Sequence, residues 1–115
     1  MNLAERNARF DALRAIGCVC CRKNRIEADL GFTFTRFLVE IHHLNGGGHH
    51  GQKRRGDEYT IPLCVWHHRG IGPAAVHTRL YGPSWAKGSK PFRAVYGGDD
   101  ELLALADRLI GVGIA

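Results

Sequence analysis

Residues 39–69 read VEIHHLNGGGHHGQKRRGDEYTIPLCVWHHR and hold six of the seven histidines of this 115-residue chain. A paired His42-His43 closes an apolar run, a glycine-rich basic loop follows, and a second apolar run leads into CVWHH at residues 64–68. This order predicts a strand, a loop, a second strand and a short helix. Since metal-binding side chains stand at both ends, we expect the rest of the chain to support a metal-binding unit.

The two predicted strands differ in how they place their side chains. Residues 32–44 alternate between apolar and polar positions, which predicts a strand with one buried face. His43 falls on the apolar, inward face, and we expect His42 to point away from it. Residues 59–65 predict a second, shorter strand, in which Pro62 indicates an edge or a strand end.

Helices are expected on both sides of this unit. Residues 2–16 lack glycine and proline and predict an amphipathic helix that ends at Gly17. An acidic first turn followed by LLALADRLI predicts a second helix over residues 99–110. Residues 70–92 contain several glycine and proline breakers and predict a long irregular arm. The arginines expected on the wet side of the first helix are Arg6, Arg9 and Arg14.

Length and composition limit the class of protein. A chain of 115 residues predicts one domain over residues 1–115, and the expected helices and strands indicate an α+β fold. The net charge of +5 indicates a polyanionic partner. Neither a signal peptide nor a membrane span is apparent, so we expect a soluble protein of the cytoplasm of a bacterial or phage-infected cell, without a membrane partner.

Two half-sites have the spacing of a zinc knuckle. Cys18 and Cys21 form a Cys-x-x-Cys pair, and Cys64 with His67 repeats the spacing far away in the sequence. Together they predict a closed Cys3His site for a structural Zn²⁺ ion, with Cys20 as a spectator. Buried free thiols are one alternative, and a redox Cys-x-x-Cys pair is another, although the βαβ context of redox pairs is missing.

The zinc assignment leaves His42, His43, Asp57 and His68 without a role. Histidines and a carboxylate around an open position suit a catalytic divalent ion, and a neutral imidazole beside it can take a proton from water. Basic side chains near such a site can hold the phosphates of a nucleic acid. The residues that we expect to contact nucleic acid are Lys53, Arg54, Arg55, Arg69, Lys87 and Lys90.

Three motifs together resemble a known nuclease family. IHHL at residues 41–44 and IPLCVWHHR at 61–69 look like the HNH (ββα-metal) endonucleases, with a glycine-rich loop between them. Within that group the chain is most similar to the Ref family of phage-type, RecA-dependent nucleases, since GPSWAKGSKPFRAVY at residues 82–96 also looks like that family. The resemblance runs from residue 18 to about residue 104. It implies a small ββα-metal core at about residues 18–70 with a structural zinc knuckle, flanking helices and an irregular arm.

The resemblance also implies chemistry. It makes His43 the general base, His42 a neighbouring metal ligand or supporting group, and His68 a ligand of the catalytic ion, Mg²⁺ or Mn²⁺. The implied reaction is hydrolysis of DNA phosphodiester bonds that leaves 5′-phosphate and 3′-hydroxyl ends. A RecA filament is the candidate protein partner, and recombination the candidate process.

The sequence departs from the HNH pattern at two positions. The middle asparagine has no counterpart where Tyr59 stands, and Asp57 is our substitute, either as the group that orients His43 or as a metal ligand. The second ligand expected on the helix is also missing, because Gly72 stands there. His77 is our candidate to supply it.

Two classes of function therefore follow from the sequence. The first is a metal-dependent HNH endonuclease. The alternative is a zinc-stabilised nucleic-acid-binding module without catalysis, which accounts for the charge and the cysteines but leaves the inward-facing His43 without a role. Cleavage of DNA in the presence of a divalent ion distinguishes the two.

Overall fold

A computed structural model describes residues 1–24, 39–44 and 56–111 of the chain. Over these residues the protein is α+β, with a two-stranded sheet and helices elsewhere. The elements in chain order are α1 (Leu3–Ile16), α2 (Val19–Asn24), β1 (Val39–His43), β2 (Thr60–Cys64), α5 (Val65–Arg69), α6 (Ala74–Tyr81), the 3-10 helix η1 (Trp85–Lys87), α7 (Ser89–Tyr96) and α8 (Asp99–Gly111). The predicted first strand is confirmed over its last residues, and residues 32–38 lie outside the described ranges.

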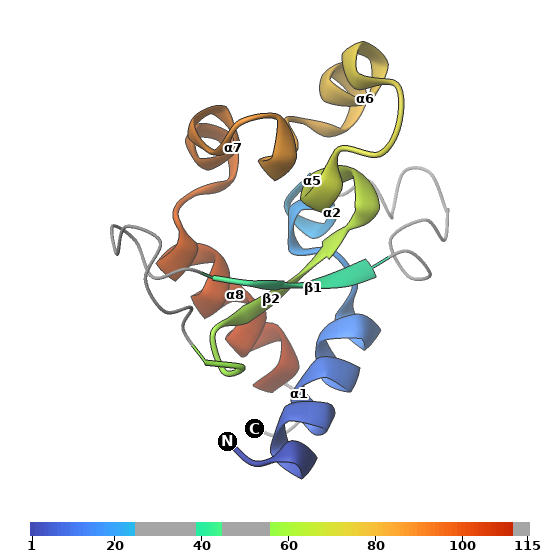
Figure 1. Cartoon of the computed structure of the whole chain (residues 1–115). Coiled ribbons are helices and arrows are strands. Elements are labelled where there is room, and N and C mark those ends of the chain that lie inside the picture. Colours follow the sequence, from blue (N-terminus) through green and yellow to red (C-terminus); the bar gives the residue numbers. More distant parts are fainter. Residues whose placement is uncertain (25–38, 45–55, 112–115) are drawn as a thin grey trace.

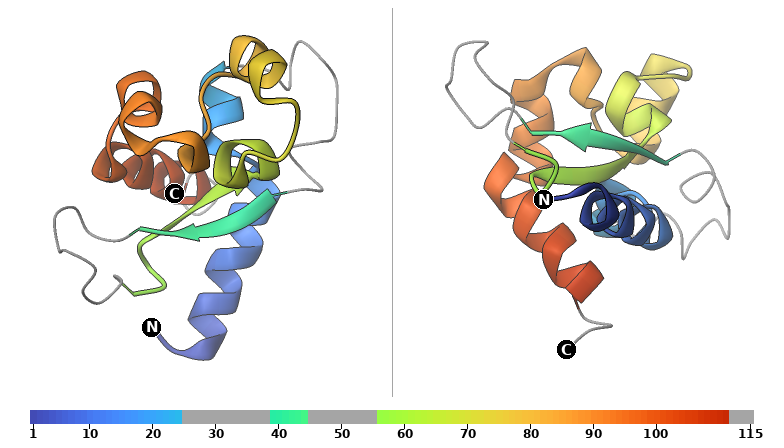
Figure 2. Two further views of the ribbon diagram at one scale, coloured as in Figure 1. Left: turned by 45° about the horizontal axis from the view of Figure 1, so that its top comes forward. Right: turned by 60° about the horizontal axis from the view of Figure 1, so that its bottom comes forward.

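The two strands pair antiparallel and are covered on both faces. Their register places His43 opposite Thr60 and Val39 opposite Cys64. Figure 1 shows α1 and α8 on one side of the pair and α5, α6 and α7 on the other, and Figure 2 shows this arrangement from two further directions. Because successive side chains of a strand point to opposite faces, neighbouring residues of β1 meet different helical layers.

Both predicted flanking helices are confirmed. Asn2 caps α1, and its side chain and that of Glu5 form a capping box, which satisfies backbone N–H groups at the helix start. Leu13 of α1 is fully buried, and Leu102 and Ala106 of α8 are buried in the same core. The two helices pack against each other and against β2, so they form a helical layer on one face of the strand pair.

The prediction of an irregular arm over residues 70–92 is wrong, because α6, η1 and the start of α7 occupy it. The glycines and prolines mark the boundaries of helices instead of preventing them. Pro73 precedes the first residue of α6, and Gly82 ends it with a φ of +90°. Pro91 lies in the first turn of α7, where backbone N–H groups have no partner within the helix, so its missing N–H removes no bond.

The prediction that Arg9 sits on the wet side of α1 is also wrong. Its side chain is only 10% exposed, because its place one turn before the buried Leu13 brings it against the core. Nε donates to Thr60 Oγ1 at 2.9 Å and Nη2 to the Thr60 carbonyl at 2.6 Å, while Nη1 pairs with Asp107 at 2.8 Å. One guanidinium therefore ties together α1, β2 and α8.

Replacing Arg9 should measurably destabilise the protein. We expect Arg9→Met to lower the free energy of unfolding by about 2 kcal/mol, because the Thr60 carbonyl and Asp107 lose their donors. The matched control is Arg14→Met, whose side chain is 52% exposed and which should change stability by less than about 0.5 kcal/mol. Urea denaturation followed by circular dichroism measures both. Equal effects of the two substitutions would contradict the role given to Arg9.

Candidate metal centre and active site

Four side chains from two short helices meet at one buried point. Cys18 and Cys21 flank the start of α2, Cys64 ends β2 and caps α5, and His67 lies in the first turn of α5. The three sulfurs and a histidine nitrogen all lie within 4.8 Å of one another. His67 Nδ1 is 3.5 Å from Cys18 Sγ, 3.5 Å from Cys21 Sγ and 3.3 Å from Cys64 Sγ. The structure thus brings together the four predicted zinc ligands, and Cys20 is not part of the group.

This donor set fits a zinc ion. Three thiols and one imidazole, all buried, form a closed tetrahedral set of the kind that structural Zn²⁺ sites use. Burial alone would lower the pKa of His67, yet hydrogen bonds and negative charge from Cys18 and Cys64 raise it to about 10. For Cys18 the directions are reversed. Burial alone would raise the pKa of this thiol, but its hydrogen bonds to the neighbouring thiols and to His67 hold the pKa well below its usual value. The four converging donors can therefore hold a metal ion such as zinc.

A second layer of hydrogen bonds fixes the orientation of His67. Its Nε2 donates to the Tyr81 carbonyl at 2.8 Å and lies 3.1 Å from the Tyr96 hydroxyl, so Nδ1 is left free to face the thiols. The Tyr96 hydroxyl donates to the same carbonyl at 2.6 Å, and Asn24 donates to that hydroxyl at 2.7 Å. These contacts join α2, α5, α6 and α7 around the centre.

The candidate active site begins at the end of β1, where His42 and His43 face opposite layers. The ring of His43 packs edge-on against Phe10 of α1, with centroids 6.1 Å apart. His42 lies instead 5.0 Å from the ring of His68 on α5 and 5.2 Å from Trp85 on η1. The predicted opposition of the two histidines is therefore present, although both faces of β1 are half-buried.

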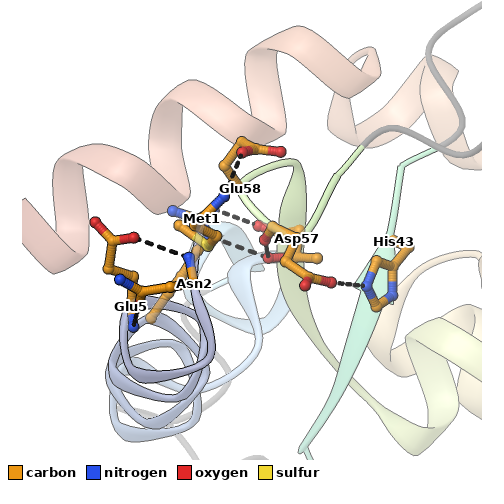
Figure 3. Close-up of polar contacts among 8 residues, drawn as sticks. Met1, Asn2, Glu5, His43, Asp57 and Glu58 are labelled. Carbon is orange, nitrogen blue, oxygen red and sulfur yellow. Dashed lines mark hydrogen bonds and ion pairs between the residues drawn. The ribbon is translucent and has the colours of Figure 1, made fainter.

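Of the two positions that the sequence left open for Asp57, the structure has the one beside His43. Its Oδ1 is 3.0 Å from His43 Nε2, and Figure 3 shows the carboxylate pointing at the imidazole ring. Thr60, the first residue of β2, holds the backbone at Asp57 in place, because its Oγ1 donates to the Asp57 carbonyl at 2.8 Å. Since a carboxylate accepts hydrogen bonds, Asp57 favours the tautomer of His43 that carries its proton on Nε2.

The sequence analysis missed Glu40, a residue of β1 that contacts His68 on α5. Its Oε1 lies 2.9 Å from His68 Nδ1, and its carboxylate pairs with Arg69 at 2.7 Å. Partial burial alone would raise the pKa of Glu40, but hydrogen bonds from Arg69 and His68 lower it. The signal was present in the sequence, because Glu40 stands two residues before His42 and strand alternation puts both on the same face.

His42 is half-buried at the end of β1. Burial is the main cause that lowers its pKa to about 4, and the nearby charges of His68, His43 and Arg93 contribute to the same shift. Its imidazole is therefore neutral at physiological pH, which is the form that binds a metal ion. Trp85, against which it packs, comes from the segment that was predicted to be irregular.

His77 occupies a different environment from the other predicted ligands. Its ring stacks on Tyr81 at 5.0 Å and lies 5.2 Å from Trp66. Within residues 1–24, 39–44 and 56–111, the Cys3His set is the one group of three or more potential ligands that converges. The structure therefore does not gather His77 with His42 and His68.

The predicted nucleic-acid contacts fall into two sets. Arg69, Lys87 and Lys90 are exposed, and the aliphatic part of Lys87 lies against Gly70 at the end of α5. Lys53, Arg54 and Arg55 lie outside the described residues. The exposed set therefore stands on the α5 side of the strands, on the same side as His42 and His68.

Comparison with known proteins identifies the family. The sequence model of the recombination enhancement, RecA-dependent nuclease family matches residues 2–111, and the chain belongs to this family. The description of the family implies a nuclease that works in recombination, with DNA and RecA involved. No individual curated protein matches the chain. Of the helices described, none is long and apolar enough to cross a membrane.

Removal of one thiol should empty the metal centre. We expect Cys64→Ser to lose about one equivalent of bound zinc per chain and to unfold at markedly lower denaturant concentration, because metal-binding energy at such a site is folding energy. Metal analysis by mass spectrometry, together with urea denaturation, tests this.

The matched control is Cys20→Ser, which changes a buried thiol next to the centre but outside the ligand group. It should keep its full zinc content. A Cys64→Ser protein that also retained a full equivalent would show that the ligands are grouped wrongly.

Proposed function

We propose that this protein is a metal-dependent, HNH-type endonuclease that hydrolyses phosphodiester bonds of RecA-bound DNA. The observation that carries the proposal is the pairing of His43 with Asp57 at the end of β1, with the facing rings of His42 and His68 on the other face of the same strand. Membership of a RecA-dependent nuclease family supports the reaction class and the partner.

His43 is the general base. Asp57 accepts a hydrogen bond from Nε2, so Nδ1 is unprotonated and can take a proton from the attacking water. Asp57 also stabilises the imidazolium that this transfer creates, which is the role of the orienting carboxylate in acid–base pairs of this kind. In this role Asp57 replaces the asparagine that gives the HNH motif its middle letter.

His42 and His68 hold the catalytic ion. Glu40 occupies Nδ1 of His68, which leaves Nε2 of that ring available as a ligand. When bound, a divalent ion stabilises negative charge on the phosphorane and on the departing 3′ oxygen. Two protein ligands suffice if phosphate oxygens and water complete the shell, as is usual for Mg²⁺ and Mn²⁺ in phosphoryl-transfer sites. Imidazole ligands favour Mn²⁺ over Mg²⁺.

The absence of a third converging ligand among the described residues also suits a second candidate function. A zinc-stabilised module that binds DNA without cutting it needs no catalytic ion. In that case the His43–Asp57 pair would serve only to fix the end of β1. The two candidates make opposite predictions in a cleavage assay.

The assay uses purified zinc-loaded protein, single- and double-stranded DNA, and added Mg²⁺ or Mn²⁺, each with and without a RecA filament. We expect cutting that depends on the added ion and increases with RecA, and products with 5′-phosphate ends. Salt-dependent binding without a cut under every condition would instead support the non-catalytic module.

Substitution of the base separates catalysis from folding. His43→Ala should abolish cutting and keep the zinc content and the circular dichroism spectrum of the wild type. Asp57→Ala should reduce the rate by about 100-fold or more, since the tautomer of His43 is no longer fixed. In the His43→Ala background, Asp57→Ala should have no further effect, because the two residues act as a unit. Active His43→Ala protein would remove this residue from the role of base.

Glu40 should control the affinity for the catalytic ion. We expect Glu40→Gln to raise the Mn²⁺ concentration needed for half-maximal cutting by about 10-fold or more, because outer partners orient and polarise a ligating histidine. Glu58→Gln is the control, since this half-exposed carboxylate pairs with the N-terminal amine and touches neither histidine. An unchanged Mn²⁺ dependence in Glu40→Gln would exclude His68 as a ligand held by Glu40.

A further inference from the structure

A chain of side-chain contacts runs from α5 across the candidate active site. Arg69 Nη2 lies 2.7 Å from Glu40, and Glu40 lies 2.9 Å from His68. The ring of His68 then faces that of His42 at 5.0 Å. The first half of this chain thus begins with an exposed guanidinium and ends at the two proposed ion ligands.

The chain continues on the far side of His42 and ends in a second guanidinium. The His42 ring lies 5.2 Å from Trp85, and Arg93 Cζ stands 4.9 Å from the centroid of the same indole ring. The Arg93 charge contributes to lowering the pKa of His42, which agrees with its position close to that ring. The proposed ion ligands therefore lie between Arg69 on α5 and Arg93 on α7.

The Arg93 side chain contacts Trp85 and Asp99 but remains partly exposed to solvent. Its side chain is 41% exposed, and its one described ion pair, with Asp99, is long at 3.5 Å. The indole face holds the guanidinium in place by a cation–π contact without occupying its N–H donors. Lys90 stands three residues earlier on α7 and is exposed on a neighbouring part of the helix surface.

We propose that Arg93 binds a phosphate of the DNA strand that is cut, so that the backbone crosses this face from α5 to α7 over the rings of His42 and Trp85. The proposal rests on the proposed function and deepens it by adding a residue that the sequence analysis did not assign to DNA binding. The ligand is a phosphodiester group of single- or double-stranded DNA. Arg69 binds the backbone on the opposite side of the ion ligands.

The chemistry of the guanidinium favours this role over a structural one. A planar guanidinium matches two phosphate oxygens and stays charged at any physiological pH. A side chain already ordered by an aromatic face loses little conformational entropy when it binds. A merely structural Arg93 would make its contribution through Trp85 and Asp99, and its loss would change stability without changing how DNA binding depends on salt.

The test compares Arg93→Gln with Arg108→Gln, an exposed arginine of α8. Each variant lowers the net charge by one. Binding of a fluorescein-labelled oligonucleotide is measured over a range of KCl concentrations, without added Mg²⁺ or Mn²⁺ so that no cutting occurs. We expect Arg93→Gln to bind about tenfold more weakly at physiological salt. The slope of log K against log salt should fall by about 0.7 for single strands and about 0.9 for duplex.

Arg108→Gln should keep the wild-type slope. An Arg93→Gln protein with the wild-type slope would overturn the proposal, as would an equal loss of slope in both variants. Failure of the proposed function is distinguishable, because it would appear as wild-type protein that never cuts, whatever the slopes show.

A second variant guards against loss of folding in Arg93→Gln. Asp99→Asn removes the carboxylate that competes for the guanidinium and leaves the arginine in place. It should bind the oligonucleotide more tightly than the wild type and keep the full salt slope. Unchanged or weaker binding by a folded Asp99→Asn protein would count against Arg93 as a phosphate ligand.

Discussion

The convergence of three thiols and one imidazole on a single buried point is the constraint on which the other contacts depend. The helices that supply these ligands, α2 and α5, have six and five residues, far fewer than a helix needs to be stable alone in water. The helical conformation of these two segments must therefore depend on tertiary contacts. A small chain has little apolar core with which to provide them, and a metal ion held by this centre would supply further stabilisation.

Two supporting networks extend from the strand pair, one on each face. On the α1 face, Arg9 binds Thr60, Thr60 holds the backbone of Asp57, and Asp57 meets His43. On the opposite face, α5 and the segment of η1 and α7 surround the other histidine of β1. The N-terminal helix thus serves the proposed base, and the C-terminal half serves the proposed ion. Neither network is visible in the short motifs that resemble the HNH nucleases.

The sequence predicted what depends on spacing and alternation. Knuckle spacing identified the four side chains that converge at the candidate metal centre, and period-two alternation placed the two histidines of β1 on opposite faces. Prediction from the sequence failed where tertiary contacts decide the structure. Glycine and proline were interpreted as breakers of structure, although Pro73 and Gly82 only delimit α6. Similarly, a charge on an amphipathic helix was interpreted as solvated, whereas Arg9 finds a carbonyl and a carboxylate in the core.

His67 and His68 are consecutive residues of one five-residue helix, yet one belongs to the metal centre and the next to the active site. A helix turns about 100° per residue, so anchoring the first ring fixes the direction of the second. Thiol oxidation that expelled the metal would release α5 and turn His68 away from its partner on β1. The proposed nuclease would then work only in a reducing compartment that contains zinc. Oxidative stress would inactivate it without any change at the residues that perform the chemistry.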